Sequence, residues 1–416
     1  MAEPILLRGA PLSARKRFFE ATHRTVSPAE TLERLRPHLR TAGVSRLADI
    51  TGLDRVGIPT VLAHRPNCPT LANAAGKGFT LVAATVSAAM EAVEIYHAEA
   101  MQLDVVEASW AELPEEARIA RDLLPLNRLA LFDDDKPYHW VEAWDLIGQR
   151  PVYVPQMCVG MAPPAGQRPL IDRPFAMGSN GLAGGNHLLE AIAAGLYEVV
   201  ERDAVACDRL LVTTIPQTWR RVDPTLVDDP SVADLLRRLG EADLELVLID
   251  CTVDTRVPCY MAFVFEAEYR HSGGTKGYGA HLDPAVAMVR AITEAVQARL
   301  IFIAGSRDDY FRRDQFAHQL ADSDAMVNDM LALAFDPDAV PLPSAASDSF
   351  EEDVATILDR LRAAGIDQAL VVDLTDPDID IPVVRVLVPG LEGYMFDQYT
   401  PGPRALAWVE RHRSLQ

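Results

Sequence analysis

The stretch GLAGGNHLLEAIAAGLYEVVERDA, residues 181–204, decides the fold class of this chain. Its small residues predict a turn, and the apolar run that follows is typical of a buried helix. Three carboxylates, Glu190, Glu198 and Glu201, nevertheless lie among the apolar residues. Burying a carboxylate without a compensating charge is unfavourable. The helix is therefore expected to line a site that supplies such a charge.

Two other stretches, residues 76–99 and 279–300, repeat this pattern, the first after a shift of 107 positions. Each has small residues, then an Ala-rich apolar run, then two oxygen-bearing side chains three positions apart. The aligned pairs are Glu91 and Glu94, Glu198 and Glu201, and Glu294 and Gln297. Residues three apart share one face of a helix, so each helix presents its pair together.

The pairs have two interpretations. Carboxylates near the end of a helix can simply reach solvent, and a single pair would need no further explanation. Between residues 79 and 95, however, the only charged residues are Glu91 and Glu94, whereas a solvated helix carries more polar residues. Three aligned copies favour carboxylates that meet a compensating charge, such as Mg²⁺ or arginine.

Composition narrows the classes of function. The net charge of −21 over 416 residues disfavours nucleic acid as a partner, because phosphate binding needs clustered Lys and Arg. No apolar run reaches the length of a membrane span, and the N-terminal residues lack the pattern of a secretory signal. The five cysteines form no CxxC pair, which argues against a zinc site and fits a reducing compartment. We therefore expect a cytoplasmic protein with no membrane or nucleic-acid partner.

A second repeat concerns the sheets. LELVLIDCTVDTRVPCYMAFVF and DQALVVDLTDPDIDIPVVRVLV each predict a strand, an Asp-rich turn and a second strand that opens at Pro258 or Pro382. A helical pattern precedes each, at residues 232–239 and 351–364, so we expect two helix–strand–strand units on a mixed sheet. The Pro- and Asp-rich region after residue 100, which includes FDDDKPYH, is interpreted as a linker.

Together these patterns predict an α+β fold with internal pseudo-repeats. In the N-terminal part, Ser27 and Glu30 predict a capping box at the start of a helix near residues 28–35. The expected parts are an N-terminal helical segment at 1–45, a main domain at 46–405 with sub-regions near 46–210 and 211–405, and a C-terminal tail at 406–416.

Over roughly residues 20–405 the chain resembles the YcaO family of ATP-dependent peptide-modifying enzymes. It is most similar to the branch encoded beside a TfuA-like protein. The stretches that carry the resemblance are GVSRLADITGLDRVGIPT, AAGKGFTLVAATVSAAMEAVEIYHAE, SNGLAGGNHLLEAIAAGLYEVVERDA, GYGAHLDPAVAMVRAITEAVQARL with GSRDD, and TPGPRA. The resemblance implies a YcaO-like fold in which Ala-rich helices line a cleft for ATP and Mg²⁺.

The resemblance also implies site residues. ATP is expected to bind without a Walker A motif, and the chain has no GxxxxGK[ST] run. The implied Mg²⁺ ligands are Glu91, Glu94, Glu190, Glu198, Glu201 and Glu294. The implied nucleotide-binding residues are Arg24, Ser87, Asn186, Arg202 and Arg290. These residue types suit the chemistry, because Mg²⁺ prefers hard oxygen ligands and arginine binds phosphate oxygens.

Several side chains keep two interpretations. Arg290 precedes Glu294 by four residues, so it either meets a phosphate or pairs with that glutamate. Lys77 either reaches a phosphate or is a solvated loop lysine. His97 and His281 are general bases or structural residues, and the cysteines are core or loop residues rather than nucleophiles. The sequence assigns no catalytic residue.

The resemblance implies that ATP phosphorylates the oxygen of a backbone amide in a ribosomally made peptide or protein. We expect thioamide formation with a TfuA-like partner, because the chain ends ALAWVERHRSLQ without the proline-rich tail of many azoline-forming members. The alternatives are an azoline-forming cyclodehydratase, a stand-alone amidine-forming enzyme, and a non-catalytic accessory factor for ribosomal-protein methylthiolation. A precursor peptide or protein is the expected substrate, and the sequence leaves a homodimer open.

Overall fold

The computed structural model describes residues 4–127, 131–161, 174–215, 218–266, 274–306, 328–393 and 400–414. Helices and sheets are mixed along the chain, which confirms the α+β class. The described helices of eight residues or more are α1 (Pro28–Leu35), α2 (Leu81–Glu99), α4 (Leu188–Thr214), α5 (Pro230–Glu241), α6 (Pro284–Ala304), α8 (Phe350–Ala363) and α9 (Pro403–Arg413). Among the described residues, none of these helices combines the length and apolarity that crossing a membrane requires.

The described strands form four sheets. The largest has the order β6-β7-β13-β14-β9, with β8 on β7, and its strands are β6 (Val105–Ser109), β7 (Pro137–Asp145), β8 (Arg150–Pro155), β9 (Leu182–Gly184), β13 (Leu370–Asp373) and β14 (Val383–Leu387). The three-stranded sheets are β3 (Arg46–Asp49), β4 (Thr60–His64) and β5 (Asn73–Lys77), and β10 (Leu244–Asp250), β11 (Cys259–Glu266) and β12 (Thr275–Ala280). The hairpin of β1 (Ile5–Leu7) and β2 (Ala10–Leu12) is the fourth.

The expectation of mixed sheets is wrong for the described strands, whose pairings are all antiparallel. The predicted helix–strand–strand units are present as α5–β10–β11 and α8–β13–β14, with Pro258 and Pro382 directly before the second strands. A short turn joins the two strands of each unit, and such a connection produces antiparallel pairing, because a parallel pair needs a crossover.

The region interpreted as a linker is also different from expectation, because β6, β7 and β8 lie there. Pro137 opens β7 within FDDDKPYH, and a proline at the first position of a strand is tolerated. Inside the strand, Trp140, Val141 and Ala143 are buried. The polar residues before the strand therefore concealed a buried strand of the largest sheet.

The described parts near the two termini include the helix α1, which begins with the predicted capping box, and the helix α9, which has a buried face. At α1 the capping box is present: the Glu30 amide donates to Ser27 Oγ at 3.3 Å, and the Ser27 amide donates to Glu30 Oε2 at 2.9 Å. The boundary placed between residues 405 and 406 falls inside α9, whose Ala405 and Val409 are buried. Residues 307–309 of the GSRDD stretch lie outside the described residues.

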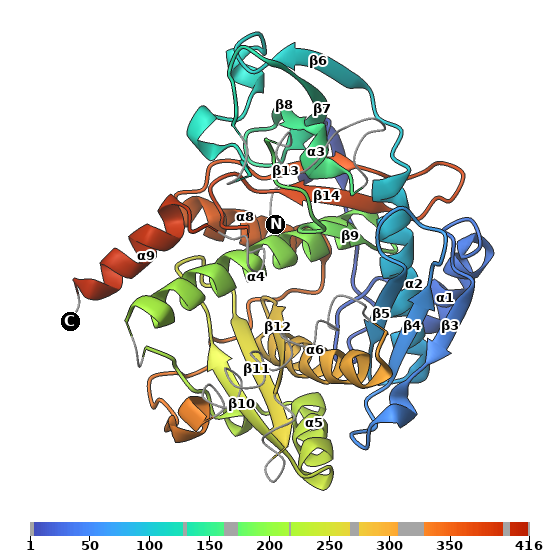
Figure 1. Cartoon of the computed structure of the whole chain (residues 1–416), viewed down its shortest axis with the longest axis vertical. Coiled ribbons are helices and arrows are strands. Elements are labelled where there is room, and N and C mark those ends of the chain that lie inside the picture. The colour runs from blue at the N-terminus through green and yellow to red at the C-terminus, as the bar shows by residue number, and fades with distance from the viewer. Residues whose placement is uncertain are drawn as a thin grey trace.

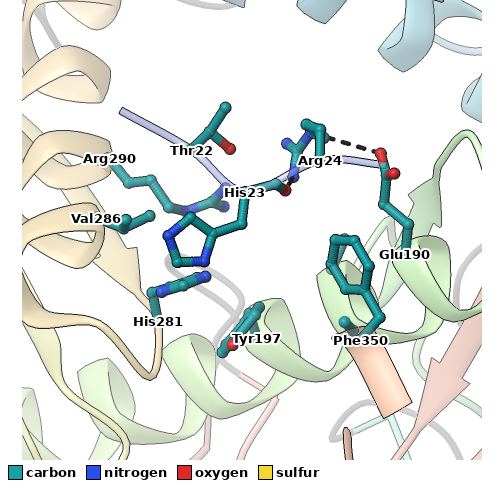
Figure 2. Close-up of a pocket in the computed structure, with 11 residues that line it drawn as sticks. Thr22, His23, Arg24, Glu190, Tyr197, His281, Val286, Arg290 and Phe350 are labelled. Atoms are coloured by element: carbon teal, nitrogen blue, oxygen red, sulfur yellow. Dashed lines mark hydrogen bonds and ion pairs between the residues drawn. The ribbon is translucent and has the colours of Figure 1, made fainter. Parts of the chain in front are cut away.

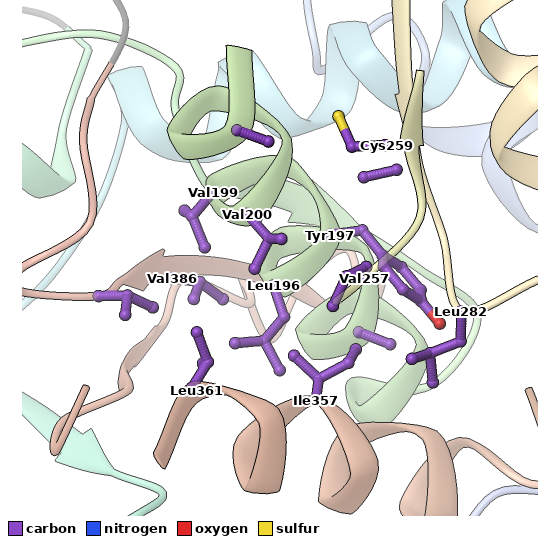
Figure 3. Packing of buried hydrophobic residues seen from close by; sticks show 14 of the residues in the cluster. Leu196, Tyr197, Val199, Val200, Val257, Cys259, Leu282, Ile357, Leu361 and Val386 are labelled. Atoms are coloured by element: carbon purple, nitrogen blue, oxygen red, sulfur yellow. The ribbon is translucent and has the colours of Figure 1, made fainter. Parts of the chain in front are cut away.

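Helix α4 is the centre of the fold. Figure 1 shows it between β9, β13 and β14 on one side and β10 to β12 with α6 on the other. Its buried residues pack on several elements, and Figure 3 shows Leu196 near Ile357 of α8 and Val386 of β14. Burial of each such side chain contributes about 1.5–3 kcal/mol. The carboxylates of α4 are thereby fixed on a rigid element.

Glycines let the Ala-rich helices approach the preceding strands. A methyl group on Gly76 of β5 would lie 2.0 Å from the Ala88 amide nitrogen and 2.2 Å from the Ala84 carbonyl oxygen. Gly279 of β12 has the same relation to the carbonyl of Ala287, at 2.2 Å. The two glycines are 203 positions apart, as are Glu91 and Glu294, so the sequence repeat is a structural repeat.

Candidate functional site

Three helix–strand units meet at the candidate site. Each Glu-bearing helix follows a strand of small residues: β5 precedes α2, β9 precedes α4 and β12 precedes α6. These three strands lie at the ends of their sheets in the described part of the chain. A strand at the end of a sheet offers backbone N–H groups that no neighbouring strand uses. The three sheet edges therefore bring donors to the carboxylates.

Four of the carboxylates accept these backbone donors. Glu91 accepts from the Ala75 amide at 3.0 Å, and its counterpart Glu294 accepts from the Tyr278 amide at 3.3 Å. In both cases the donor strand directly precedes the helix of the carboxylate. In the first two pairs the second position instead reaches the next unit. The Gly184 amide of β9 donates to Glu94 at 2.6 Å, and the Ala280 amide of β12 donates to Glu201 at 3.1 Å.

A lysine closes this arrangement into a ring. Lys77 of β5 donates to Glu294 of α6 at 2.9 Å, so the third helix is joined to the first strand. The five carboxylates Glu91, Glu94, Glu198, Glu201 and Glu294 form what we call the carboxylate ring. Lys77 is thus a partner of the ring rather than a solvated loop residue.

Within the carboxylate ring Glu201 is buried and the other four carboxylates are partly buried. Burial raises the pKa of Glu94 to about 8, with neighbouring Glu91 and Glu198 adding to the effect. Burial likewise raises the pKa of Glu91 and of Glu198 to about 7, and it raises that of Glu201. These shifts mark carboxylates that lack sufficient positive charge. A divalent cation is the group that this donor set would accept.

The exception within the ring is Glu294. Burial alone would raise its pKa, but the Lys77 ammonium foremost, and then nearby arginines, lower it. Arg202 shows the reverse balance: burial would lower its pKa, but the neighbouring carboxylates, Glu201 foremost, raise it. The Arg202 guanidinium lies 3.9 Å from Glu201 Oε1 and 4.0 Å from Glu198 Oε1. Arg202 therefore faces the ring.

Arg290 makes no ion pair with Glu294 in the described part of the chain, where the cation paired with Glu294 is Lys77. Its Nε atom is buried and has no hydrogen-bond partner among the described residues. The charge of Arg290 nevertheless contributes to the lowered pKa of Glu294. Arg290 is thus a charged residue beside the ring whose Nε has no partner among the described residues.

Glu190 lies apart from the ring and is held by several donors. Both the amide and the hydroxyl of Thr25 donate to Glu190 Oε2, at 2.9 and 2.7 Å. Asn186 Nδ2 donates to Oε1 at 3.1 Å, and Arg24 Nε lies 3.6 Å from the same oxygen. This network brings Arg24 and Asn186 to the side of the ring. Ser87 lies one helical turn before Glu91, on the same face of α2.

Sequence reasoning missed Arg385, a fully buried arginine of β14. It donates to the carbonyl oxygens of Val159 and Asn180, both at 3.0 Å, and its charge opposes the raised pKa of Glu198. Burial lowers the pKa of Arg385 itself to about 10. The signal was a lone arginine in the apolar strand PVVRVLV, because a buried charge needs a partner.

The other candidate side chains take no part in the ring. His97 is buried and its Nδ1–H donates to the Val93 carbonyl at 2.7 Å. Burial raises the pKa of the Cys158 thiol to about 12, and it also raises those of Cys207, Cys251 and Cys259. These four buried thiols are therefore protonated core residues, not activated nucleophiles.

The residues of the carboxylate ring lie within the part of the chain that matches a known protein family. The family model of the YcaO cyclodehydratase, described as ATP- and Mg²⁺-binding, matches residues 75–392. An uncharacterized protein in the tfuA 3′ region of Rhizobium leguminosarum bv. trifolii is 37% identical over 391 residues, 90% of each chain.

Two solved structures are similar over most of this chain. YcaO from Methanopyrus kandleri bound with AMPPCP and Mg²⁺ is 26% identical, with a TM-score of 0.70 over 93% of this chain and 97% of that one. A heterocyclase in complex with substrate and cofactor is 26% identical, with a TM-score of 0.78 over 98% of this chain. This chain spans 57% of the length of that heterocyclase.

Proposed function

We propose, given that this chain belongs to the YcaO family, that it uses ATP to activate a backbone amide of a ribosomally made peptide or protein. ATP and Mg²⁺ are its cofactors, because the matched domain binds both. The observation that carries the proposal is the carboxylate ring, which lies wholly within the matched residues 75–392. Five glutamates whose charge Lys77 and Arg202 offset only in part would have little reason to converge without a cation.

The residues of the site divide into two roles. The carboxylate ring and Glu190 would hold Mg²⁺ against the triphosphate, and bound Mg²⁺ neutralises the charge that phosphoryl transfer develops. Arg202 and Arg290 would bind phosphate oxygens through charge-assisted hydrogen bonds. Arg24, Ser87 and Asn186 would complete the nucleotide contacts. The backbone donors of β5, β9 and β12 keep the carboxylate oxygens oriented, so little reorganisation accompanies binding.

The reaction is a phosphoryl transfer to a carbonyl oxygen. A nucleophile adds to the amide carbon, and the resulting oxyanion attacks the γ-phosphorus of ATP, whose bond to the bridging oxygen breaks and releases ADP. The C–O bond then breaks and inorganic phosphate leaves with the former carbonyl oxygen. In thioamide formation the added sulfur loses its proton and forms the double bond to carbon, whereas in azoline formation the former amide nitrogen loses its proton and forms the C=N bond. This chain positions the reactants and stabilises charge, as in other phosphoryl transfers.

We propose sulfide as the source of the nucleophile, so that the product is a thioamide, with a TfuA-like protein as partner. The support is the name of the relative from Rhizobium leguminosarum bv. trifolii, which places it in the tfuA 3′ region. Azoline formation is the second candidate, supported by the cyclodehydratase family model and by the heterocyclase that covers 98% of this chain. The two reactions differ in the nucleophile that reaches the carbon and in the atom, sulfur or the former amide nitrogen, that ends doubly bonded to it.

Mass analysis of a treated peptide separates these products. The chain is incubated with ATP, Mg²⁺, sulfide and a precursor peptide encoded beside it, with and without the TfuA-like protein. A second peptide lacks Cys, Ser and Thr. Thioamide formation predicts replacement of oxygen by sulfur in both peptides, with phosphate released in equal amount. Loss of water from the first peptide alone, without a need for sulfide, would instead identify the azoline reaction.

A further inference from the structure

A small pocket lies beside Glu190, and Arg290 is among the residues that line it. It lies between the segment 22–24, helix α4 and helix α6, and its volume of about 20 Å³ is enough for one water molecule or one oxygen atom. Figure 2 shows His23 and His281 at its centre, with Arg24 and Arg290 on either side. Both histidines lie outside the repeated carboxylate pairs of the sequence.

The hydrogen bonds of the two histidines fix their tautomers. Lys16 Nζ lies 3.1 Å from His23 Nδ1, and because an ammonium has no acceptor, His23 Nδ1 must accept. His281 Nδ1 accepts from the Asp283 backbone amide at 2.9 Å. In both rings the proton of the neutral imidazole therefore resides on Nε2. No partner of either Nε2 is found within the described part of the chain, so both rings offer an N–H donor and neither offers a base.

The histidines stay neutral because of their surroundings. Burial foremost, and then the Lys16 ammonium, lower the pKa of His23 to about 4. Burial lowers the pKa of His281 as well, with His23 and Lys16 adding to the effect. The rings also pack edge-on, with centroids 4.9 Å apart, and Tyr197 packs on His281 at 4.5 Å. The pair is thus a rigid set of neutral donors.

A buried ion pair anchors this set and excludes a metal ion from it. His23, His281 and Asp353 bring potential ligand atoms within 4.8 Å of one another. Lys16 Nζ, however, lies 2.5 Å from Asp353 Oδ2 and 2.8 Å from the Ser347 carbonyl oxygen, besides contacting His23. Both side chains of the Lys16–Asp353 pair are fully buried. The ammonium already fills the position that a cation would take.

The walls of the pocket supply donors as well. Arg24 and Arg290 both line it, and the buried Nε of Arg290 has no hydrogen-bond partner among the described residues. Glu190 also lines the pocket, but its oxygens already accept from Thr25 and Asn186. His23, His281, Arg24 and Arg290 thus all line a space of one-oxygen size. Such a set of donors stabilises an oxygen that carries negative charge.

We propose that this pocket binds one anionic oxygen of the reaction, with His23 and His281 as neutral donors held in place by Lys16 and Asp353. The inference rests on the proposed function for its occupant. That oxygen belongs either to the γ-phosphoryl group of ATP or to the peptide carbonyl that receives it. His23 and His281 donate hydrogen bonds and exchange no proton with the substrate, so no bond to either ring forms or breaks.

The test replaces the distal donor while keeping the proximal acceptor. In His23→Asn and His281→Asn, Oδ1 of asparagine takes the place of Nδ1, so the bonds from Lys16 and from the Asp283 amide remain available, while the Nε2–H is lost. His97→Asn is the matched control, because it changes a buried histidine outside the pocket. Calorimetry measures binding of AMPPCP with Mg²⁺, and phosphate release measures turnover with ATP, sulfide and the precursor peptide.

The two sources of the oxygen predict different results. If it belongs to ATP, each pocket variant binds AMPPCP about ten-fold more weakly, whereas His97→Asn does not. If it belongs to the peptide, AMPPCP binding is unchanged and kcat falls by about a hundred-fold without a matching change in KM. Folded variants with unaltered binding and unaltered kcat would overturn the proposal. If the unsubstituted chain shows no peptide-dependent phosphate release, the proposed function fails, and unchanged AMPPCP binding then overturns the pocket as well.

Discussion

Replacing Glu94 by glutamine should stabilise the protein when no metal or nucleotide is bound. In the folded chain, burial raises the pKa of Glu94 from 4.5 to about 8. At pH 7 the folded state therefore carries a nearly protonated Glu94, whereas the unfolded state is ionised. The difference amounts to about 3 kcal/mol of lost stability at pH 7. Glutamine keeps the acceptor for the Gly184 amide and removes this loss.

The sign of the pH dependence follows from the raised pKa. The folded state binds the proton of Glu94 more tightly than the unfolded state does. The resulting contribution to the free energy of unfolding is fully present below pH 4.5 and is lost as the pH rises through about 8. Glu94→Gln should therefore match the unsubstituted chain near pH 5 and exceed it increasingly towards pH 8. Since Glu94 is partly exposed to water, about 3 kcal/mol is an upper bound.

Thermal melts in EDTA at pH 5, 7 and 8 measure this effect. An unfolding entropy of about 2.1 cal/mol/K per residue converts the bound at pH 7 into a Tm increase of at most about 3 °C for this chain. Glu107→Gln is the control, because Glu107 is exposed on β6. A fall in Tm of several degrees at pH 7, or a difference that does not vary with pH, would refute the reasoning and identify Glu94 as a structural residue.

Two further substitutions test other parts of the account. Gly76→Ala should unfold the protein or lower its Tm by many degrees, because the added methyl group would lie 2.0 Å from the Ala88 amide nitrogen. The control is Gly52→Ala, whose methyl group meets nothing within 4 Å. Equal melts for the two variants would contradict the close approach of β5 and α2. Lys77→Met should raise the pKa of Glu294, which Lys77 lowers, and so move the pH midpoint of Mg²⁺ binding upward. An unchanged midpoint in calorimetry across pH 5 to 8 would show that the Lys77–Glu294 pair does not control the site.

The features of this structure that depend on residues close together in the chain could be predicted from the sequence. The E-x-x-[EQ] pairs, the helices that carry them, the capping box at Ser27 and the prolines before β11 and β14 each depend on residues within a few positions. Such patterns can be recognised without knowing the fold. The alignment of the three Glu-bearing helices even anticipated their shared approach to one place.

What the sequence did not reveal depends on contacts between distant residues. Arg385 reaches the site from β14, and Lys16 pairs with Asp353 across 337 positions, so no local spacing links them to their partners. The antiparallel sheets were missed because strand direction is set by which strands meet. The strands β6 to β8 were not predicted because the polar, Pro-rich residues before β7 are typical of a loop and hide the apolar residues that follow.

Calorimetric titration of AMPPCP in the presence of Mg²⁺ tests the central claim most directly. The carboxylate ring is expected to bind one nucleotide with Mg²⁺, and the double variant Glu91→Ala, Glu198→Ala should remain folded and lose this binding. Both residues have pKa values raised to about 7 in the unliganded chain, so their removal relieves repulsion and does not threaten the fold. Undiminished binding by the folded double variant would contradict the assignment of the carboxylate ring as the metal and nucleotide site.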